Sequence, residues 1–170
     1  MIKGAVIQLT DEQYQDAIAL GKARYTNNRE HGVLKTHIHG VDPVQADVEG
    51  VAGEIAFAQL VNADTSEIKR IGVTSSEQGT DAGDVIHAGL CIDVKTTKYE
   101  GGHLLVYAHK LDNPNIDGYV LMTGYRGRYT CRGYISKEAI KVGIETDRFK
   151  MQSRNTYWIN QNDLGDINSD

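Results

Sequence analysis

Two segments with helical patterns come first in the chain, and short runs of β-branched residues follow. This order constrains the fold more than any single motif. Thr10 and Gln13 have the spacing of a capping box, which predicts a helix from Asp11 to Asn27 or Asn28. Apolar residues recur at helical spacing over 48–61 and predict a second helix. This order is typical of an α+β domain.

The rest of the chain contains β-branched runs separated by glycines, which predict short strands. The predicted strands cover 69–74, 84–87, 91–97, 104–108, 118–125, 130–135 and 156–159. A short helix is predicted at 136–141, because Ser136 is a suitable N-cap and Glu138 follows in the first turn. We therefore expect a sheet with little helix after residue 61.

Size and composition favour one globular domain in an intracellular compartment. The chain has 170 residues, 40% hydrophobic and 24% charged, which fits a single domain over 1–170. No apolar run of about 18 residues predicts a membrane span, and residues 1–8 lack the long apolar stretch of a secretory signal. Two cysteines are too few for a disulfide scaffold. We expect a cytoplasmic protein, located in the host cytoplasm if a phage encodes it.

The charge is unevenly distributed. The net charge of −5 argues against coating nucleic acid by bulk attraction. Residues 95–154 nevertheless carry 11 Lys and Arg against 6 Asp and Glu, interleaved with tyrosines. Such a mixture suits a phosphate backbone and its bases, and the predicted nucleic-acid contacts are Lys98, Arg126, Arg128 and Arg132. The alternative is a solvated sheet face with ordinary tyrosines.

The segment 83–97 predicts a β-hairpin that carries two acids. Two short apolar runs flank Ala88-Gly89, a suitable two-residue turn. Counting outward from this turn places Asp84 opposite Asp93, and opposite residues of an antiparallel pair project to the same side. Asp81 is an alternative to Asp84 if the register is shifted.

Lys95 follows Asp93 by two residues, so the pleat places both side chains on one face. Two carboxylates at cross-strand distance repel each other unless a cation compensates, and Mg²⁺ prefers such oxygen ligands. Glu54, in the predicted second helix, is a third available acid; its alternative role is an ordinary exposed helix acid.

These residues resemble the PD-(D/E)XK nuclease superfamily, which has the restriction-endonuclease-like fold. The family pattern is a helical Glu, then an Asp at one strand, then Asp or Glu, any residue and Lys on the next. Glu54, Asp84 and Asp93-Val94-Lys95 match this order. The resemblance implies a mixed central β-sheet flanked by helices, with an N-terminal helix and loop at 1–47, a catalytic core at 48–125 and C-terminal strands and a helix at 126–170.

Two positions depart from the family pattern. Gly83 stands where the motif has its proline. The family also follows its lysine strand with a helix, whereas 99–115 has a weak helical pattern interrupted by glycines and a proline.

The resemblance implies a Mg²⁺-dependent nuclease acting on DNA, with endonuclease cleavage expected and Mn²⁺ able to replace Mg²⁺. Asp84, Asp93 and the main-chain carbonyl of Val94 would bind the metal, and Glu54 would complete the shell directly or through water. Lys95 would orient the attacking water or stabilise charge on the phosphate. Either one or two metals is compatible with three acids, and a homodimer would suit two-strand cleavage.

Two other functions are compatible with the sequence. A non-catalytic nucleic-acid-binding or assembly module on the same scaffold would use the basic, tyrosine-rich stretch after residue 95 without a metal. A metal-dependent hydrolase of small phosphoesters would use the acids without needing a DNA-binding surface.

Overall fold

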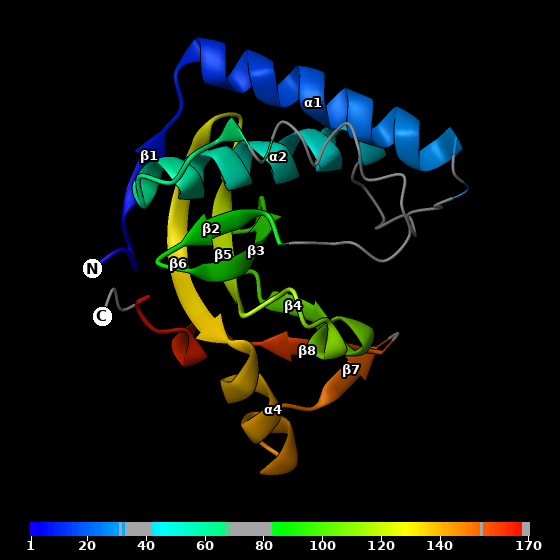
Figure 1. Cartoon of the computed structure of the whole chain (residues 1–170), viewed down its shortest axis with the longest axis vertical. Coiled ribbons are helices and arrows are strands. Elements are labelled where there is room, and N and C mark those ends of the chain that lie inside the picture. The colour runs from blue at the N-terminus through cyan, green and yellow to red at the C-terminus, as the bar shows by residue number, and fades with distance from the viewer. Residues whose placement is uncertain (31, 33–41, 67, 69–82, 154, 168–170) are drawn as a thin grey trace.

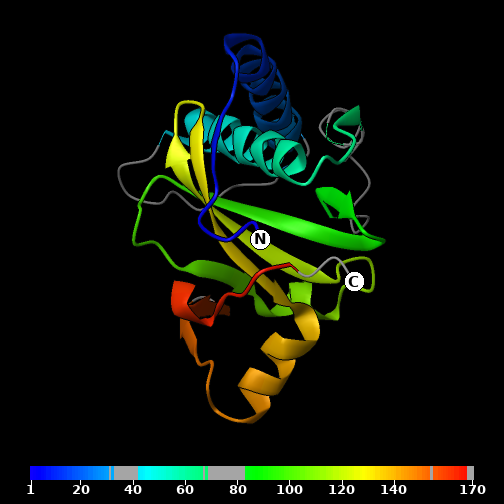
Figure 2. The same ribbon diagram turned by 90° about the vertical axis from the view of Figure 1, so that its left-hand side faces the viewer.

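Helices cover one face of a central sheet, and a second, smaller sheet covers the other (Figures 1 and 2). This arrangement comes from a computed structural model, which describes residues 1–30, 32, 42–66, 68, 83–153 and 155–167. It confirms the α+β class expected from the sequence. The predicted strand at 69–74 and the alternative acid Asp81 lie outside the described residues.

Helix α1 spans Asp11–Glu30 and begins with the predicted capping box. The main-chain N–H of Gln13 donates to Thr10 Oγ1 at 3.2 Å, and the N–H of Thr10 donates to Gln13 Oε1 at 2.9 Å. These reciprocal bonds satisfy two N–H groups that the first helical turn leaves unpaired. The predicted start is therefore correct, and the helix continues two to three residues beyond the predicted end.

Helix α2 spans Pro43–Leu60 and begins five residues before the predicted start at Val48. Asp42 caps it by accepting a hydrogen bond from the N–H of Val44 at 3.0 Å. Pro43 occupies the first turn, where its missing N–H costs nothing. Most of α2 is buried, so the spacing of its apolar residues does not show at which residue the helix begins.

The central sheet has the strand order β1-β6-β5-β3-β2. Its members are β1 (Val6–Gln8), β2 (Val85–His87), β3 (Leu90–Thr97), β5 (Gly118–Tyr125) and β6 (Arg128–Ser136). β3 and β5 are parallel and the other neighbours are antiparallel, so the sheet is mixed. The sequence predicts β5 at its observed limits and the other long strands to within two residues, but it does not predict β1.

The smaller sheet has the order β4-β8-β7, formed by Leu104–Tyr107, Thr156–Ile159 and Met151–Ser153. The connection from β3 to the parallel strand β5 passes through β4 and the 3₁₀ helix η1 (Ala108–Asp112). All of residues 98–117 are described, and this stretch contains no α-helix. The helix that the family resemblance places here is therefore replaced by a strand of the second sheet.

Helix α4 spans Lys137–Glu145 and lies beyond the second sheet from α1 and α2 (Figure 1). Ser136 caps it by accepting a hydrogen bond from the N–H of Ala139 at 3.1 Å. The cap was predicted from the sequence, and the helix continues four residues beyond the predicted end.

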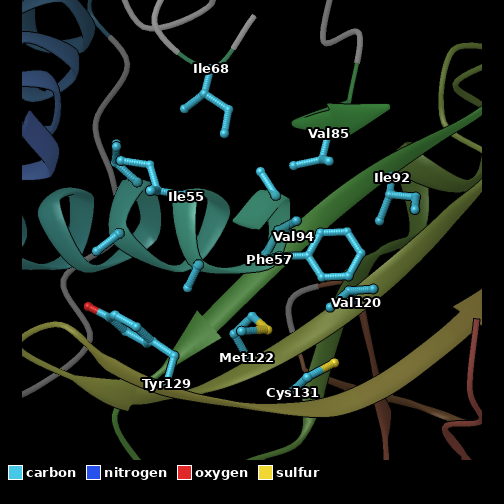
Figure 3. Close-up of a cluster of buried hydrophobic side chains, with 14 of the residues drawn as sticks. Ile55, Phe57, Ile68, Val85, Ile92, Val94, Val120, Met122, Tyr129 and Cys131 are labelled. Atoms are coloured by element: carbon cyan, nitrogen blue, oxygen red, sulfur yellow. The ribbon is translucent and has the colours of Figure 1, made fainter. Parts of the chain in front are cut away.

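Two apolar clusters hold these layers together on opposite faces of the central sheet. The first fills the space between α2 and the sheet, and Figure 3 shows Phe57, Ile92, Val94, Val120 and Met122 meeting there. The second lies on the other face and includes Leu104, Val106, Tyr119, Leu121, Ile140 and Ile159. Alternate residues of β3 and β5 therefore face different cores, as the period of a strand requires.

Within the described residues, no helix combines the length and the apolar character needed to cross a bilayer.

Candidate active site

The hairpin formed by β2 and β3 has the register predicted from the sequence. His87 pairs with Leu90, Ile86 with Cys91, and Val85 with Ile92. Ala88 and Gly89 form the turn with φ values of 49° and 78°, the left-handed conformations that a two-residue hairpin of this twist needs. The ladder ends at Val85, so Asp84 precedes the strand and is not a ladder partner of Asp93 as expected.

Asp84 instead reaches along the edge of β3. Its N–H donates to the carbonyl of Ile92 at 2.8 Å, and its carboxylate accepts a hydrogen bond from the N–H of Val94 at 2.7 Å. The first residue of β2, Val85, pairs with Ile92, and β3 continues beyond this pair to Thr97. Val94 therefore has no ladder partner in β2. The N–H and C=O of one residue in an extended strand point to the same edge, so the Val94 carbonyl shares this edge with Asp84.

Asp93 and Lys95 project from β3 toward the second core, on the side of Tyr119 and Leu121 of the parallel strand β5. Lys95 Nζ lies 2.7 Å from Asp93 Oδ1. Asp93 is 5% exposed, and its Oδ2 is buried without a hydrogen-bond partner among the described residues. A buried carboxylate oxygen of this kind requires a partner, and a cation would provide one.

Glu54 comes from α2, on the other side of the sheet, and is held by Arg24 of α1. The two guanidinium NH₂ groups donate to the two carboxylate oxygens at 2.6 and 2.8 Å. Glu54 is 4% exposed, so it is not the exposed helix acid of the alternative interpretation. Sequence reasoning did not assign Arg24 to this site, because a single arginine on a polar helix face has no pattern that distinguishes it.

The charges of these residues influence one another. Burial raises the pKa of the Asp84 carboxyl well above its usual value, and the negative charges of Glu54 and Asp93 raise it further. For Lys95, burial opposes the charged form, but the attraction of Asp93 and Asp84 outweighs this effect and raises its pKa. Lys95 therefore keeps its proton near neutral pH and is suited to stabilising negative charge.

A family model matches the part of the chain that carries this cluster. The model described as "Family of unknown function (DUF5843)" matches residues 2–128, three quarters of the chain. The chain belongs to this family. No curated protein and no solved structure matches the chain. The matched segment includes Arg24, Glu54, Asp84, Asp93 and Lys95, so the DUF5843 model spans the whole cluster.

The predicted nucleic-acid contacts of this DUF5843 protein lie toward the end of the central sheet where β3 and β5 end and β6 begins. Lys98 is exposed just after β3, and Arg126 and Arg128 are exposed at the turn between β5 and β6. Arg132, on β6, donates to Thr123 Oγ1 at 2.5 Å and to Glu100 at 3.2 Å. Lys98 and Arg126 lie over Tyr99 and Tyr125, with 5.3 and 5.1 Å to the ring centroids.

The described residues contain no group of three or more His, Cys, Asp or Glu side chains placed to hold a metal ion by themselves. Mg²⁺ does not need such a group, because it is commonly bound by one or two carboxylates while water and phosphate oxygens complete its shell. Asp84, Asp93 and the Val94 carbonyl provide this smaller set of hard oxygen donors. The partnerless Oδ2 of Asp93 makes the set fit a divalent cation.

Proposed function

We propose that this protein is a Mg²⁺-dependent deoxyribonuclease that hydrolyses DNA phosphodiester bonds, as an endonuclease, in the cytoplasm. The observation that carries the proposal is the hydrogen bond from the Val94 N–H to the Asp84 carboxylate. This bond brings the acid of the preceding segment onto the strand that carries Asp93 and Lys95. A restriction-endonuclease-like core is supported by the order of a helical Glu54, the β2–β3 hairpin and the parallel strand β5.

Each residue has a role that follows from its surroundings. Asp84, Asp93 and the Val94 carbonyl would hold Mg²⁺, for which Mn²⁺ could substitute, and Glu54 would act through a bound water because Arg24 holds both of its oxygens. The bound ion supplies polarisation of the scissile phosphate and a lowered pKa of the attacking water. Lys95, which keeps its proton, orients that water and stabilises the charge that develops on the phosphate.

The direct test is cleavage of supercoiled plasmid, linear duplex and single-stranded DNA with Mg²⁺, with Mn²⁺ and with excess chelator. We expect cleavage with either metal and none with chelator. Asp93→Asn and Lys95→Met should lower the rate of cleavage by about 10²–10³-fold. Lys150→Met, which removes an exposed charge outside the predicted sites, should retain it. Equal cleavage by the wild type and both site variants would refute the assignment.

A non-catalytic DNA-binding module is the second candidate function. It is favoured by the exposed Lys98 and Arg126, each lying over a tyrosine ring. DNA binding in chelator that weakens with salt and is lost on neutralising Arg126 and Arg128, together with no cleavage under any metal condition, would select this function. A homodimer, which would suit two-strand cleavage, is tested by the molar mass in solution.

A further inference from the structure

Arg24 belongs to the candidate site although it is not an acid or a motif residue. It is the described hydrogen-bond partner of Glu54, and its side chain is 17% exposed while that of Glu54 is 5% exposed. A bidentate arginine–carboxylate pair uses two of the five N–H groups of the guanidinium. The other N–H groups remain for another acceptor, and the exposed part of the side chain makes them reachable.

The packing of α1 on α2 fixes the position of Arg24. Gly21 lies three residues earlier on the same side of α1, and a Cβ added to it would lie 2.5 Å from the Cα of Val48. The two helices are thus in backbone contact about one turn from Arg24. The arginine is supported by a rigid contact, so its place beside Glu54 is part of the packed structure.

The balance of charges at the site would change when a cation binds, and this bears on Arg24. Glu54, Asp84 and Asp93 face two cationic groups, Arg24 and Lys95, and the field of Asp84 also acts on Arg24. A divalent cation would add two positive charges to this set. The acids would then be more than neutralised, and the guanidinium would attract an anion.

We propose that Arg24 sets the charge balance of the site: it neutralises Glu54 when no cation is bound, and binds a DNA phosphate when the cation is present. This inference rests on the proposed function. It makes Arg24 a positioning residue for Glu54 in the free protein and a substrate contact in the complex. It also limits the affinity of the free protein for cations, so cation and DNA bind more tightly together than separately.

The first test measures Mn²⁺ binding to the full chain without DNA, by electron paramagnetic resonance. Arg24→Gln removes the charge but keeps an amide donor for Glu54, and we expect at least threefold tighter Mn²⁺ binding. Arg24→Lys keeps the charge but loses the two-pronged contact, and should stay within twofold of the wild type. Lys22→Gln, an exposed change on the same helix with the same loss of charge, should also stay within twofold.

Weaker Mn²⁺ binding by Arg24→Gln or by Arg24→Lys would overturn the proposal, because it would mean that Arg24 serves the cation only by orienting Glu54. The lysine variant decides the question even if the glutamine variant fails to fold. Circular dichroism spectra and thermal unfolding midpoints identify any variant that has lost its structure.

The second test measures the affinity for a fluorescent DNA duplex in Mg²⁺, in a Lys95→Met background that is expected to cleave about 10²–10³-fold more slowly than the wild type. Adding Arg24→Gln should weaken binding at least tenfold in Mg²⁺, and adding Lys22→Gln should weaken it less than threefold. Equal effects of the two substitutions would refute the phosphate contact.

The outcome for the proposed function is separate. A wild-type protein that binds Mn²⁺ but cleaves no DNA refutes the nuclease, while the Mn²⁺ affinities of the variants still decide the charge role of Arg24. A wild-type protein that binds no Mn²⁺ refutes both proposals.

Discussion

Lys95 and Asp93 form an ion pair of 2.7 Å between side chains two residues apart on β3, and the lysine remains one-third exposed at its outer end. The ammonium is therefore held in place by the buried acid, while part of the side chain stays open to solvent. We expect Lys95→Met to lower the rate of plasmid cleavage by about 10²–10³-fold, the usual effect of removing one preorganised charge. Lys150→Met is the matched control, because it removes an exposed charge outside the predicted sites, and should retain activity within about threefold.

The raised pKa of Asp84 predicts a pH dependence of cation binding. A carboxyl with a raised pKa holds its proton at a pH where an ordinary aspartic acid has lost it, and a cation must displace that proton. We expect Mg²⁺ to bind more tightly as pH rises through the pKa of Asp84 and to release protons on binding. Calorimetry in two buffers with different ionisation enthalpies measures this release, and Asp84→Asn should remove it.

The same shift has a consequence for stability without metal. Because the folded state holds the Asp84 proton more tightly than the unfolded state, the contribution of this group to stability is fully present below the unfolded pKa and is lost as pH rises through the folded pKa. Asp84→Asn should therefore unfold at higher temperature than the wild type at alkaline pH, with a smaller difference in acid. A difference that grew toward acid pH would contradict the raised pKa.

Two glycines of α2 should respond in opposite ways to alanine. A Cβ on Gly53 would lie 2.0 Å from Thr96 Oγ1, whereas a Cβ on Gly50 would have no atom within 4 Å. We expect Gly53→Ala to destabilise the protein by about 1–3 kcal/mol through overpacking. Gly50→Ala should stabilise it by about 0.5–1 kcal/mol, because alanine has the higher helix propensity. Urea unfolding measures both, and Thr96→Ala in the Gly53→Ala background should restore part of the loss.

Glu49 of α2 is another buried acid, and its contacts predict an effect on stability. Its carboxylate accepts hydrogen bonds from the hydroxyls of Tyr14 and Tyr129 and from the N–H of Arg126, which joins α1, α2 and the β5–β6 turn. Tyr129→Phe should cost about 1–3 kcal/mol, because it removes a buried hydrogen bond to a charged acceptor. Tyr125→Phe, at an exposed tyrosine, should change the unfolding free energy by less than about 0.5 kcal/mol.

Short sequence motifs were sufficient to predict the helices that they begin and the hairpin that they connect. The Thr10–Gln13 capping box, the Ser136 cap and the Ala88-Gly89 turn each fix backbone geometry within a few residues, so α1, α4 and the hairpin register follow from them. The grouping of Asp93 and Lys95 also follows, since the period of a strand determines it.

Contacts between distant segments could not be predicted in the same way. β1 has three residues and exists because it pairs with β6, more than a hundred residues away. Arg24 joins the site because Gly21 allows α1 to approach α2 closely, and no residue spacing reveals such a contact. Asp84 lies outside the hairpin ladder and accepts a hydrogen bond from the N–H of Val94. This contact depends on which residue begins β2 and not on the register of the hairpin.

The pairing of β1 with β6 has a consequence for any attempt to isolate a minimal fragment. The family match ends at residue 128, where β6 begins, yet Val6, Ile7 and Gln8 of β1 bond to this strand. A polypeptide that ends at residue 128 would lack β6, the strand that pairs with both β1 and β5. The edge of β5 would then be long and exposed. We expect such a truncation to aggregate, so production of the protein should retain the segment beyond residue 128.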